Sequence, residues 1–269
     1  MEMRIVRIGF AAALIAAGTV FFAVPAMARD LPTRNPEPVE AARVVAVTDG
    51  DTISTETGAE VRLTGIQAPK LPLGRPGFRA WPLAERAKQT LARLALEKTA
   101  RLEYRGRKID RWGRLLADVY VGQTWLQREM VKLGMARVYT FADNRAGAAA
   151  LYDAERRARA AKTGIWALDW YRILSPADLA DRIGTFQIVE AAPVSAALVR
   201  GQGFINFGDD WRTDFTISTP RTKMKLFRAA GVKIEHYQGK RLRVRGWLIR
   251  RNGPMITVTH PEQIEVVSK

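Results

Sequence analysis

Along the first 170 residues, stretches in which hydrophobic positions follow the two-residue period of a strand alternate with stretches in which they follow the period of a helix. Short runs rich in β-branched and aromatic residues are typical of strands, and ETGAE between two of them is a hairpin turn signal. A longer run places Leu83, Ala87, Leu91 and Leu94 on one face of a helix. The pattern predicts strands within 43–66, 100–104 and 115–121 and helices over 83–98, 124–134 and 148–164.

The pattern becomes mostly β after the third helix. The stretch SPADLADRIG, which starts at Ser175, predicts a short linking helix because Pro176 suits a first turn. Five short strands and one helical stretch then suit a small β-barrel. These strands are predicted over 184–191, 201–209, 212–219, 239–249 and 254–260, and the helix over 220–231.

The N-terminal segment has the three parts of a secretory signal peptide. Arg4 and Arg7 precede a long apolar run, and small residues around Ala28 offer a cleavage site. An uncleaved membrane anchor is the alternative, although the apolar run is slightly short for a span. We expect an exported protein, periplasmic or secreted, whose mature form has no stable membrane span. The predicted organisation is a signal peptide over 1–28, a linker over 29–40, a first domain over 41–170, a linking helix over 171–183 and a second domain over 184–269.

Charge and composition narrow the chemistry. The chain has 43 Lys and Arg against 27 Asp and Glu, a formal net charge of +16, and such an excess attracts polyanions. It has no Cys and only two His, which excludes disulfides and thiolate metal sites and disfavours zinc or Ser-His chemistry. Catalysis is left to carboxylates, Arg, Lys, Tyr or a metal bound by carboxylates.

Four signatures follow one another along the chain: DGDT at 49–52, VRLTGIQAP at 61–69, DRWGR at 110–114 and AERRARAAKTGIW at 154–166. Together they resemble the staphylococcal nuclease (thermonuclease) family over residues 43–166. The resemblance implies a β-rich α+β fold in which a five-stranded OB-type barrel carries three helices. We expect a smaller OB-like β-barrel to follow it.

The resemblance also implies a site in which one Ca²⁺ supports hydrolysis of DNA and RNA. The family's first metal ligand falls on Asp51, and its two phosphate-clamping arginines fall on Arg62 and Arg114. Its second metal ligand, an Asp, falls on Gln67, and its catalytic Glu falls on Lys70. Ca²⁺ is therefore the expected cofactor only if the site is active.

Elementary chemistry indicates what the two replacements do. Ca²⁺ takes about six to eight oxygen ligands, several of them charged. Gln67 offers one neutral amide oxygen, and Lys70 brings a positive charge where an oxygen is needed. Arg62 and Arg114 keep guanidinium groups that match phosphate oxygens. We expect phosphate binding to persist and Ca²⁺-dependent hydrolysis to be lost or weak.

Further residues are candidates for contact with single-stranded DNA or RNA, or with another polyanion. Trp112 and Tyr139 have rings that can stack on bases. Three arginines near residue 243 alternate with aliphatic residues, which places them on one face of a predicted strand. The nucleic-acid-binding candidates are Asp110, Arg111, Trp112, Tyr139, Arg241, Arg243 and Arg245.

Two alternatives stand beside this degenerate nuclease. An active nuclease would need another carboxylate in place of Lys70, and Glu60 and Glu85 are the candidates. A non-enzymatic module of the cell envelope would use the fold only as a scaffold. Binding that does not respond to salt would favour the envelope module, because phosphate contacts release counterions.

Overall fold

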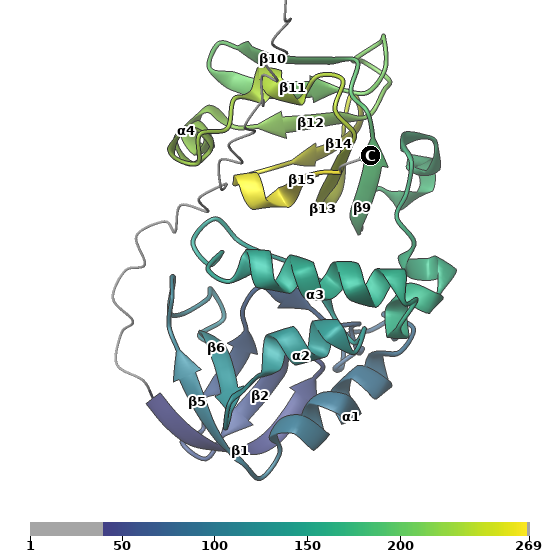
Figure 1. The fold of residues 1–269 in the computed structure, drawn as a ribbon. Coiled ribbons are helices and arrows are strands. Elements are labelled where there is room, and N and C mark those ends of the chain that lie inside the picture. Colours follow the sequence, from purple (N-terminus) through teal and green to yellow (C-terminus); the bar gives the residue numbers. More distant parts are fainter. Residues whose placement is uncertain (1–39, 268–269) are drawn as a thin grey trace, which may run out of the picture. The chain divides into compact units, whose positions relative to one another are not determined.

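The computed structural model describes residues 40–267 (Figure 1). The predicted signal peptide, and the predicted linker as far as residue 39, lie outside the described residues. All described residues belong to one compact unit of the chain. None of the helices between residues 40 and 267 is long and apolar enough to cross a membrane.

A closed five-stranded barrel forms the first half of the described chain. Its strands are β1 (Glu40–Asp49), β2 (Thr52–Thr55), β3 (Glu60–Leu63), β5 (Thr99–Glu103) and β6 (Leu115–Val121), with short strands β4 (Ile66–Gln67), β7 (Thr124–Trp125) and β8 (Arg137–Val138) beside them. β1 pairs antiparallel with β2 and β5, β2 pairs with β3, and β5 pairs with β6. A parallel pairing between β3 and β6 closes the ring.

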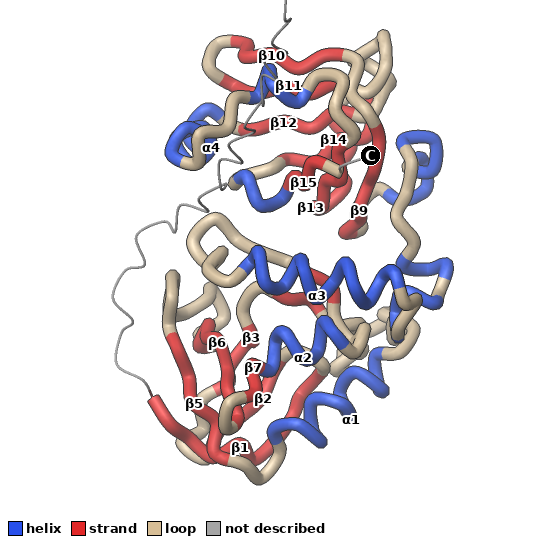
Figure 2. Tube along the Cα trace, viewed as in Figure 1, coloured by secondary structure: helices blue, strands red, loops and turns tan. Residues whose placement is uncertain are grey.

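Three helices accompany this barrel, as the sequence predicts (Figure 2). They are α1 (Ala84–Ala95), α2 (Leu126–Lys132) and α3 (Ala148–Ala160). Ala87, Leu91 and Leu151, which the helical spacing places inward, are fully or almost fully buried in the core of the barrel. The helices therefore form because each has an apolar face that the barrel covers.

A second sheet follows, with a helix inserted in it. Its elements are β9 (Phe186–Ala191), β10 (Ser195–Val199), β11 (Gln202–Asn206), β12 (Thr216–Thr219), α4 (Met224–Ala229), β13 (Leu242–Arg251), β14 (Gly253–Thr257) and β15 (Ile264–Val266). Antiparallel pairings join β10 to β11, β11 to β12, β14 to β13 and β13 to β9. β12 and β14 pair in parallel.

The second sheet repeats the strand connectivity of the first barrel. In each, a three-strand meander leads into a helix and then into two further strands, and the third strand pairs in parallel with the last of these. The first strand of the second meander is broken into β9 and β10 around Pro193. The two parts of the broken strand pair with opposite ends of the second sheet, β10 with β11 and β9 with β13, so this sheet also curls round on itself and is called the second barrel from here on. The predicted OB-type barrel and the predicted β-rich second part are both present.

Two details of the second half differ from the sequence-based prediction. The sheet has strands β10 and β15 in addition to the predicted five; β10 has the sequence SAALV, whose small residues give a weak strand signal. The predicted linking helix is instead a pair of 3₁₀ turns, Pro176–Asp178 and Ala180–Arg182. The backbone N–H and the hydroxyl of Ser175 both donate to Asp178, at 2.8 and 2.7 Å, which closes the first turn after three residues.

The two barrels contact each other through a buried charge cluster. Arg245 on β13 is 1% exposed, and its guanidinium donates to Glu155 on α3 at 2.8 Å and to Glu265 on β15 at 2.6 Å. The ring of Tyr152 lies 4.4 Å from the same guanidinium. The prediction that Arg245 belongs to an exposed nucleic-acid-binding face is therefore wrong. That face of β13 is covered at Arg245 by α3, which supplies the carboxylate.

Removing Arg245 should destabilise the protein strongly. Arg245→Ala leaves two carboxylates without their buried partner, so we expect the free energy of unfolding to fall by about 3–5 kcal/mol in urea titrations. Arg241→Ala is the matched control just before the same strand, since Arg241 pairs with Glu190 while its side chain is 59% exposed; its cost should stay below about 1 kcal/mol. Equal losses in the two variants would contradict this assignment.

His260 makes the contact between the barrels sensitive to pH. It is buried, its Nε2 lies 2.7 Å from the hydroxyl of Thr140, and burial together with the charges of Arg145 and Lys223 lowers the pKa of His260 from 6.5 to about 4. Between these two pH values the unfolded chain binds one more proton than the folded one. The contribution of neutral His260 to the free energy of unfolding is therefore complete above pH 6.5 and is lost as the pH falls towards 4.

The size of this pH effect is measurable against His260→Gln. The difference in free energy of unfolding between wild type and this variant should be constant above pH 6.5. On acidification to pH 4 the wild type should lose on the order of 3 kcal/mol of this free energy relative to the variant. Parallel stability curves for the two proteins over this range would show that His260 is not held neutral.

Candidate functional site

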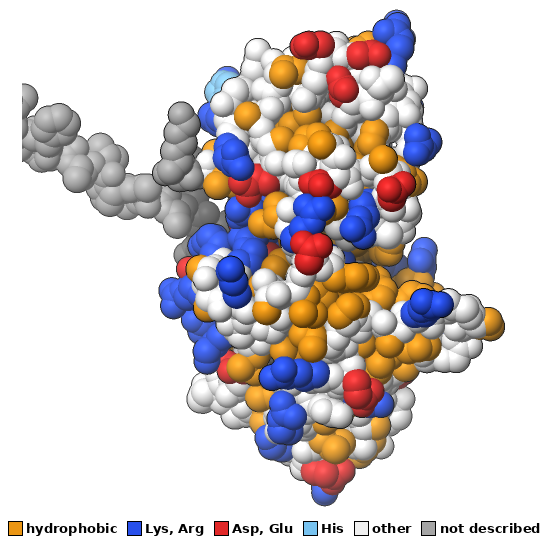
Figure 3. Space-filling view, turned by 90° about the vertical axis from the view of Figure 1, so that its right-hand side faces the viewer, with side chains coloured by type: hydrophobic (Ala, Val, Ile, Leu, Met, Phe, Trp, Pro, Cys, Tyr) orange, Lys and Arg blue, Asp and Glu red, His pale blue; other side chains and the backbone are white. Residues whose placement is uncertain are grey.

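A cleft of about 700 Å³ lies beside the first barrel and collects most of the residues that the sequence singled out. Six cationic side chains line it against three acidic ones, so the cleft attracts anions. Six aromatic side chains line it as well. Figure 3 shows one face of the molecule, on which a patch of hydrophobic side chains is bordered by Lys and Arg.

Asp49 of DGDT lines the cleft, whereas Asp51, in the same tight turn between β1 and β2, is fully buried and does not line it. Gly50 allows this turn to pack closely, because a Cβ there would come within 2.6 Å of Ala68 and 2.7 Å of Ala87. Asp49 accepts a hydrogen bond from the backbone N–H of Asp51 at 3.0 Å, and Asp51 accepts one from Ala68 at 2.7 Å. Both carboxylates are therefore buried and fixed by backbone donors.

Lys70 provides the cation that balances these carboxylates. Its Nζ lies 2.8 Å from both side-chain oxygens of Asp51 and 3.3 Å from Oδ2 of Asp49. Lys70 follows Pro69, and its carbonyl accepts the backbone N–H of Trp81 at 2.9 Å, which closes the loop that carries it. The ammonium group is thus held between two carboxylates by the fold itself.

The protonation of the two aspartates follows from this arrangement. Burial alone would raise the pKa of Asp51, but the charges of Arg62 and Lys70 outweigh it and hold that pKa well below its usual range. Burial and the neighbouring charge of Asp51 raise the pKa of Asp49, against the opposing effect of Lys70. Asp51 is therefore a firmly ionised carboxylate that already has a cationic partner.

These residues do not fit the Ca²⁺ that the family resemblance implies. Both oxygens of Asp51 are bonded to the Lys70 ammonium, so a metal ion would have to displace a positive charge covalently attached to the chain. Within residues 40–267, no group of three or more His, Cys, Asp or Glu side chains is placed to hold a metal ion. Chemistry in this cleft is best derived from the side chains alone.

Gln67, at the family's second ligand position, has a different partner. Its Oε1 accepts two hydrogen bonds from Arg137 on β8, from Nε at 3.0 Å and from Nη2 at 2.7 Å. Arg137 is buried, and the ring of Phe186, at the start of β9, lies 4.4 Å from its guanidinium. Burial lowers the pKa of Arg137 to about 10. This position therefore anchors an arginine that packs against the second barrel.

Arg62 and Arg114 both line the cleft, as predicted for the phosphate clamp, but they are held differently. Arg62 donates to the carbonyls of Leu63 and Ile66, each at 2.5 Å, and its Nη2 lies 3.3 Å from Asp51. Arg114 is bound only by Asp110 of its own loop, at 2.9 Å, and its side chain is 25% exposed. Arg114 is the more accessible of the two to a phosphate group.

The DRWGR loop presents Trp112 beside the cationic groups. Asp110 accepts the backbone N–H groups of Trp112 and Arg114, at 2.9 and 3.0 Å, so its role is to shape the loop. The guanidinium of Arg111 lies 4.1 Å from the ring of Trp112, which is 65% exposed. Tyr139 lines the same cleft. All four of these predicted contact residues line it.

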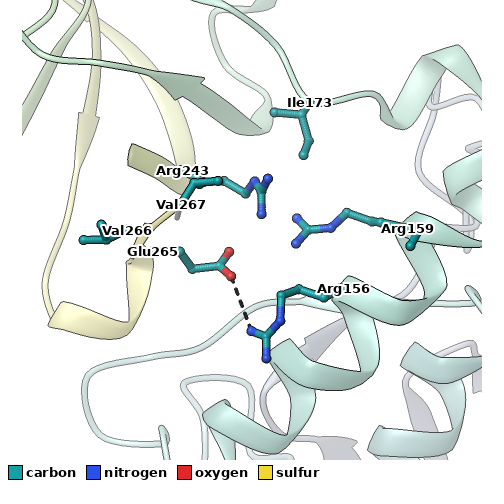
Figure 4. A pocket seen from close by; sticks show the side chains of 8 residues that line it. Arg156, Arg159, Ile173, Arg243, Glu265, Val266 and Val267 are labelled. Atoms are coloured by element: carbon teal, nitrogen blue, oxygen red, sulfur yellow. Dashed lines mark ion pairs between the residues drawn. The ribbon is translucent and has the colours of Figure 1, made fainter. Parts of the chain in front are cut away.

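The predicted arginine face of β13 is not part of this cleft. Glu190 on β9 accepts hydrogen bonds from Arg241 at 2.6 Å and from Arg243 at 2.5 and 2.9 Å. Figure 4 shows Arg243 pointing towards Arg159 of α3, in a separate pocket of about 670 Å³ where Arg156 also faces Glu265. Arg241 and Arg243 therefore neutralise Glu190 within the second barrel, and Arg245 joins the two barrels through Glu155.

The two carboxylates considered as replacements for the catalytic Glu lie elsewhere. Glu60 and Glu85 are both exposed, and neither lines the cleft. The acidic side chains that do line it are Asp49, Asp110 and Asp143. Of these, Asp49 is paired with Lys70 and Asp110 with Arg114.

The sequence does not place two further residues, Arg137 and Trp247, at this site. Arg137 alternates with Val138 on a two-residue strand and looks like any strand arginine until its bonds to Gln67 are seen. Trp247 belongs to the second barrel, more than a hundred residues from the motifs, yet it lines the same cleft. Only the contact between the barrels brings Trp247 to the site.

Comparison with known proteins agrees with these motifs. A family model described as Staphylococcal nuclease homologue matches residues 60–168. A thermonuclease of Staphylococcus hyicus is 28% identical over 127 residues, which cover 46% of this chain and 74% of that protein. An uncharacterized endonuclease of Haemophilus influenzae is 37% identical over 101 residues, which cover 36% of this chain and 51% of that protein.

Exchanging the charge of Lys70 should create a demand for a metal. Lys70→Glu places a third carboxylate beside Asp49 and Asp51, so the melting temperature in EDTA should fall by on the order of 10 °C. Adding Ca²⁺ at about 100 times its Kd should return about 2.7 kcal/mol of stability. Wild type and Lys132→Glu, a control at an exposed lysine, should show no response to Ca²⁺. If Ca²⁺ stabilised the wild type as much as the variant, Lys70 would not be the cation that neutralises Asp49 and Asp51.

Proposed function

Because residues 60–168 form a staphylococcal nuclease homologue domain, we propose that this protein binds nucleic acid through its phosphates without a metal ion. In this proposal Lys70 takes the place of a bound cation, and Ca²⁺-dependent hydrolysis is lost or very weak. The observation that carries it is the position of the Lys70 ammonium, 2.8 Å from both oxygens of Asp51.

The charges of the cleft support binding. Lys70 and Arg62 are paired with Asp49 and Asp51. Arg107 and Arg111 also line the cleft, and they have no carboxylate partner among the described residues. Arg114 shares Asp110 but remains accessible. A phosphodiester in the cleft meets guanidinium donors in the geometry that favours phosphate oxygens.

The same charges disfavour turnover. Hydrolysis needs a group that accepts the proton of the attacking water, a contribution of about 10²–10⁴ in rate. Asp51 is a poor acceptor because its pKa is held low by Arg62 and Lys70, and Asp49 is occupied by Lys70. Lys70 therefore withdraws Asp49 and Asp51 as proton acceptors, while the accessible arginines of the cleft remain available to a phosphate.

We further propose that the protein acts after export from the cytoplasm. The N-terminal segment with its cleavage signal near Ala28 supports this. An intact mass of the native protein that begins at Arg29 is the expected result. A native protein that retains the whole segment would argue against cleavage.

The binding proposal is tested with a fluorescent single-stranded DNA. We expect binding to be unchanged by EDTA and weakened by salt, and neither Ca²⁺ nor Mg²⁺ to produce cleavage. Arg114→Ala should raise the Kd roughly tenfold, since a charge-assisted hydrogen bond contributes about 1.5 kcal/mol or more. It should also reduce the slope of log K against log salt by about 0.7.

Arg128→Ala is the matched control for this experiment. Arg128 is exposed on α2 and does not line the cleft, so its loss removes the same charge from the molecule without touching the site. Metal-dependent cleavage that disappears in Arg114→Ala would instead establish a working nuclease. Binding that does not respond to salt would favour an envelope module.

A further inference from the structure

Three aromatic side chains of the cleft, Tyr139, Phe141 and Trp247, belong to one aromatic cluster that comes from both barrels. Phe141 and Tyr139 follow β8 of the first barrel, and their rings lie 4.8 Å apart. Phe186, on β9 of the second barrel, lies 4.8 Å from Tyr139 and 6.3 Å from Trp247 on β13. The sequence separates these contributors widely, and the contact between the barrels joins them into one surface.

Trp247 is held firmly and yet remains open to the cleft. Its indole N–H donates to the hydroxyl of Tyr139 at 3.1 Å, and the edge-to-face contact with Phe186 fixes the ring from a second direction. Even so, 47% of the residue is exposed, and Phe141, which contacts Tyr139, is 49% exposed. A rigid aromatic surface that is left uncovered is typical of a binding site, whereas an aromatic side chain that fills a core is covered by its neighbours.

The chemistry next to this surface indicates what would cover it. Lys70, Arg111 and Arg114 line the same cleft, so an apolar ligand part at Trp247 would be attached to an anionic part at these groups. A nucleotide chain has this combination, with a flat base on each phosphate-linked sugar. Bases in a duplex are already stacked and paired, so only an unpaired base can reach the ring.

We propose that Trp247 of the second barrel is a base-stacking residue for single-stranded nucleic acid bound in the cleft of the first barrel. This rests on the proposed phosphate binding and assigns the second barrel a direct part in it. Tyr139 positions the indole, Trp247 stacks on one unpaired base, and the neighbouring phosphates lie against the arginines of the cleft.

The test compares two oligonucleotides of equal length, one of ordinary single-stranded DNA and one with abasic sites throughout. Stacking contributes about 1–3 kcal/mol per base, so Trp247→Ala should raise the Kd for ordinary DNA roughly 5- to 150-fold. The Kd for the abasic strand should not change, because that strand offers phosphates and no rings. Trp211→Ala is the control, since Trp211 is 51% exposed on the second barrel and does not line the cleft.

Trp247→Phe separates stacking from structure. It removes the indole N–H that bonds Tyr139 but keeps an aromatic ring, so it should retain most of the affinity for ordinary DNA. Equal Kd values for wild type and Trp247→Ala, with binding still weakened in Arg114→Ala, would overturn the stacking role and leave phosphate binding intact. Equal weakening of ordinary and abasic strands would show a structural role and also overturn it. No binding of either strand to wild type would refute the proposed function together with this inference.

Discussion

The ion pair between Lys70 and Asp51 is the interaction on which the cleft depends. It supplies a cation that the chain carries itself, and it lets two buried aspartates share one tight turn. A buried carboxylate is stable only when a partner compensates for its desolvation. With that partner built in, the charge balance of the site is complete before any ligand arrives, and the remaining arginines are available to anions.

The second replacement in the motif serves the contact between the barrels. Gln67 holds the buried guanidinium of Arg137, and the ring of Phe186 from β9 packs on its other side. A neutral amide is suited to this task, because it satisfies two N–H groups of the arginine without adding a negative charge to the cleft. Gln67, at the position of the implied second metal ligand, thus helps to attach the second barrel through Arg137.

The sequence predicts the parts of this structure that depend on local pattern. The helical spacing around Leu91, the turn in DGDT and the strands of the first barrel are written in short stretches, and the ordered motifs add the family. The resemblance also implies that Gln67 and Lys70 stand at the positions of a metal ligand and a catalytic Glu. The sequence cannot show that Lys70 bonds Asp51 or that Arg137 reaches Gln67, because those contacts join segments about 20 and 70 residues apart.

Arg245 shows the limit of periodicity most clearly. Alternation predicts Arg241, Arg243 and Arg245 on one face of a strand, and Arg241 and Arg243 do share Glu190 as their partner. Whether such a face meets solvent, however, depends on what packs on it. Here α3 covers part of that face and offers Glu155, which turns an expected ligand contact into a structural ion pair. The role of Trp247 is hidden for the same reason, since only the contact between barrels brings it to the cleft.

The most direct test of the metal-free site is a crystal structure of the protein grown with Ca²⁺ and a short single-stranded oligonucleotide. Anomalous scattering distinguishes Ca²⁺ from an ammonium group at the position between Asp49 and Asp51. We expect that Lys70 stays within hydrogen-bonding distance of Asp51, that no anomalous peak appears there, and that a phosphate lies against Arg114. A Ca²⁺ ion bound to Asp51, with Lys70 displaced from the site, would contradict this expectation.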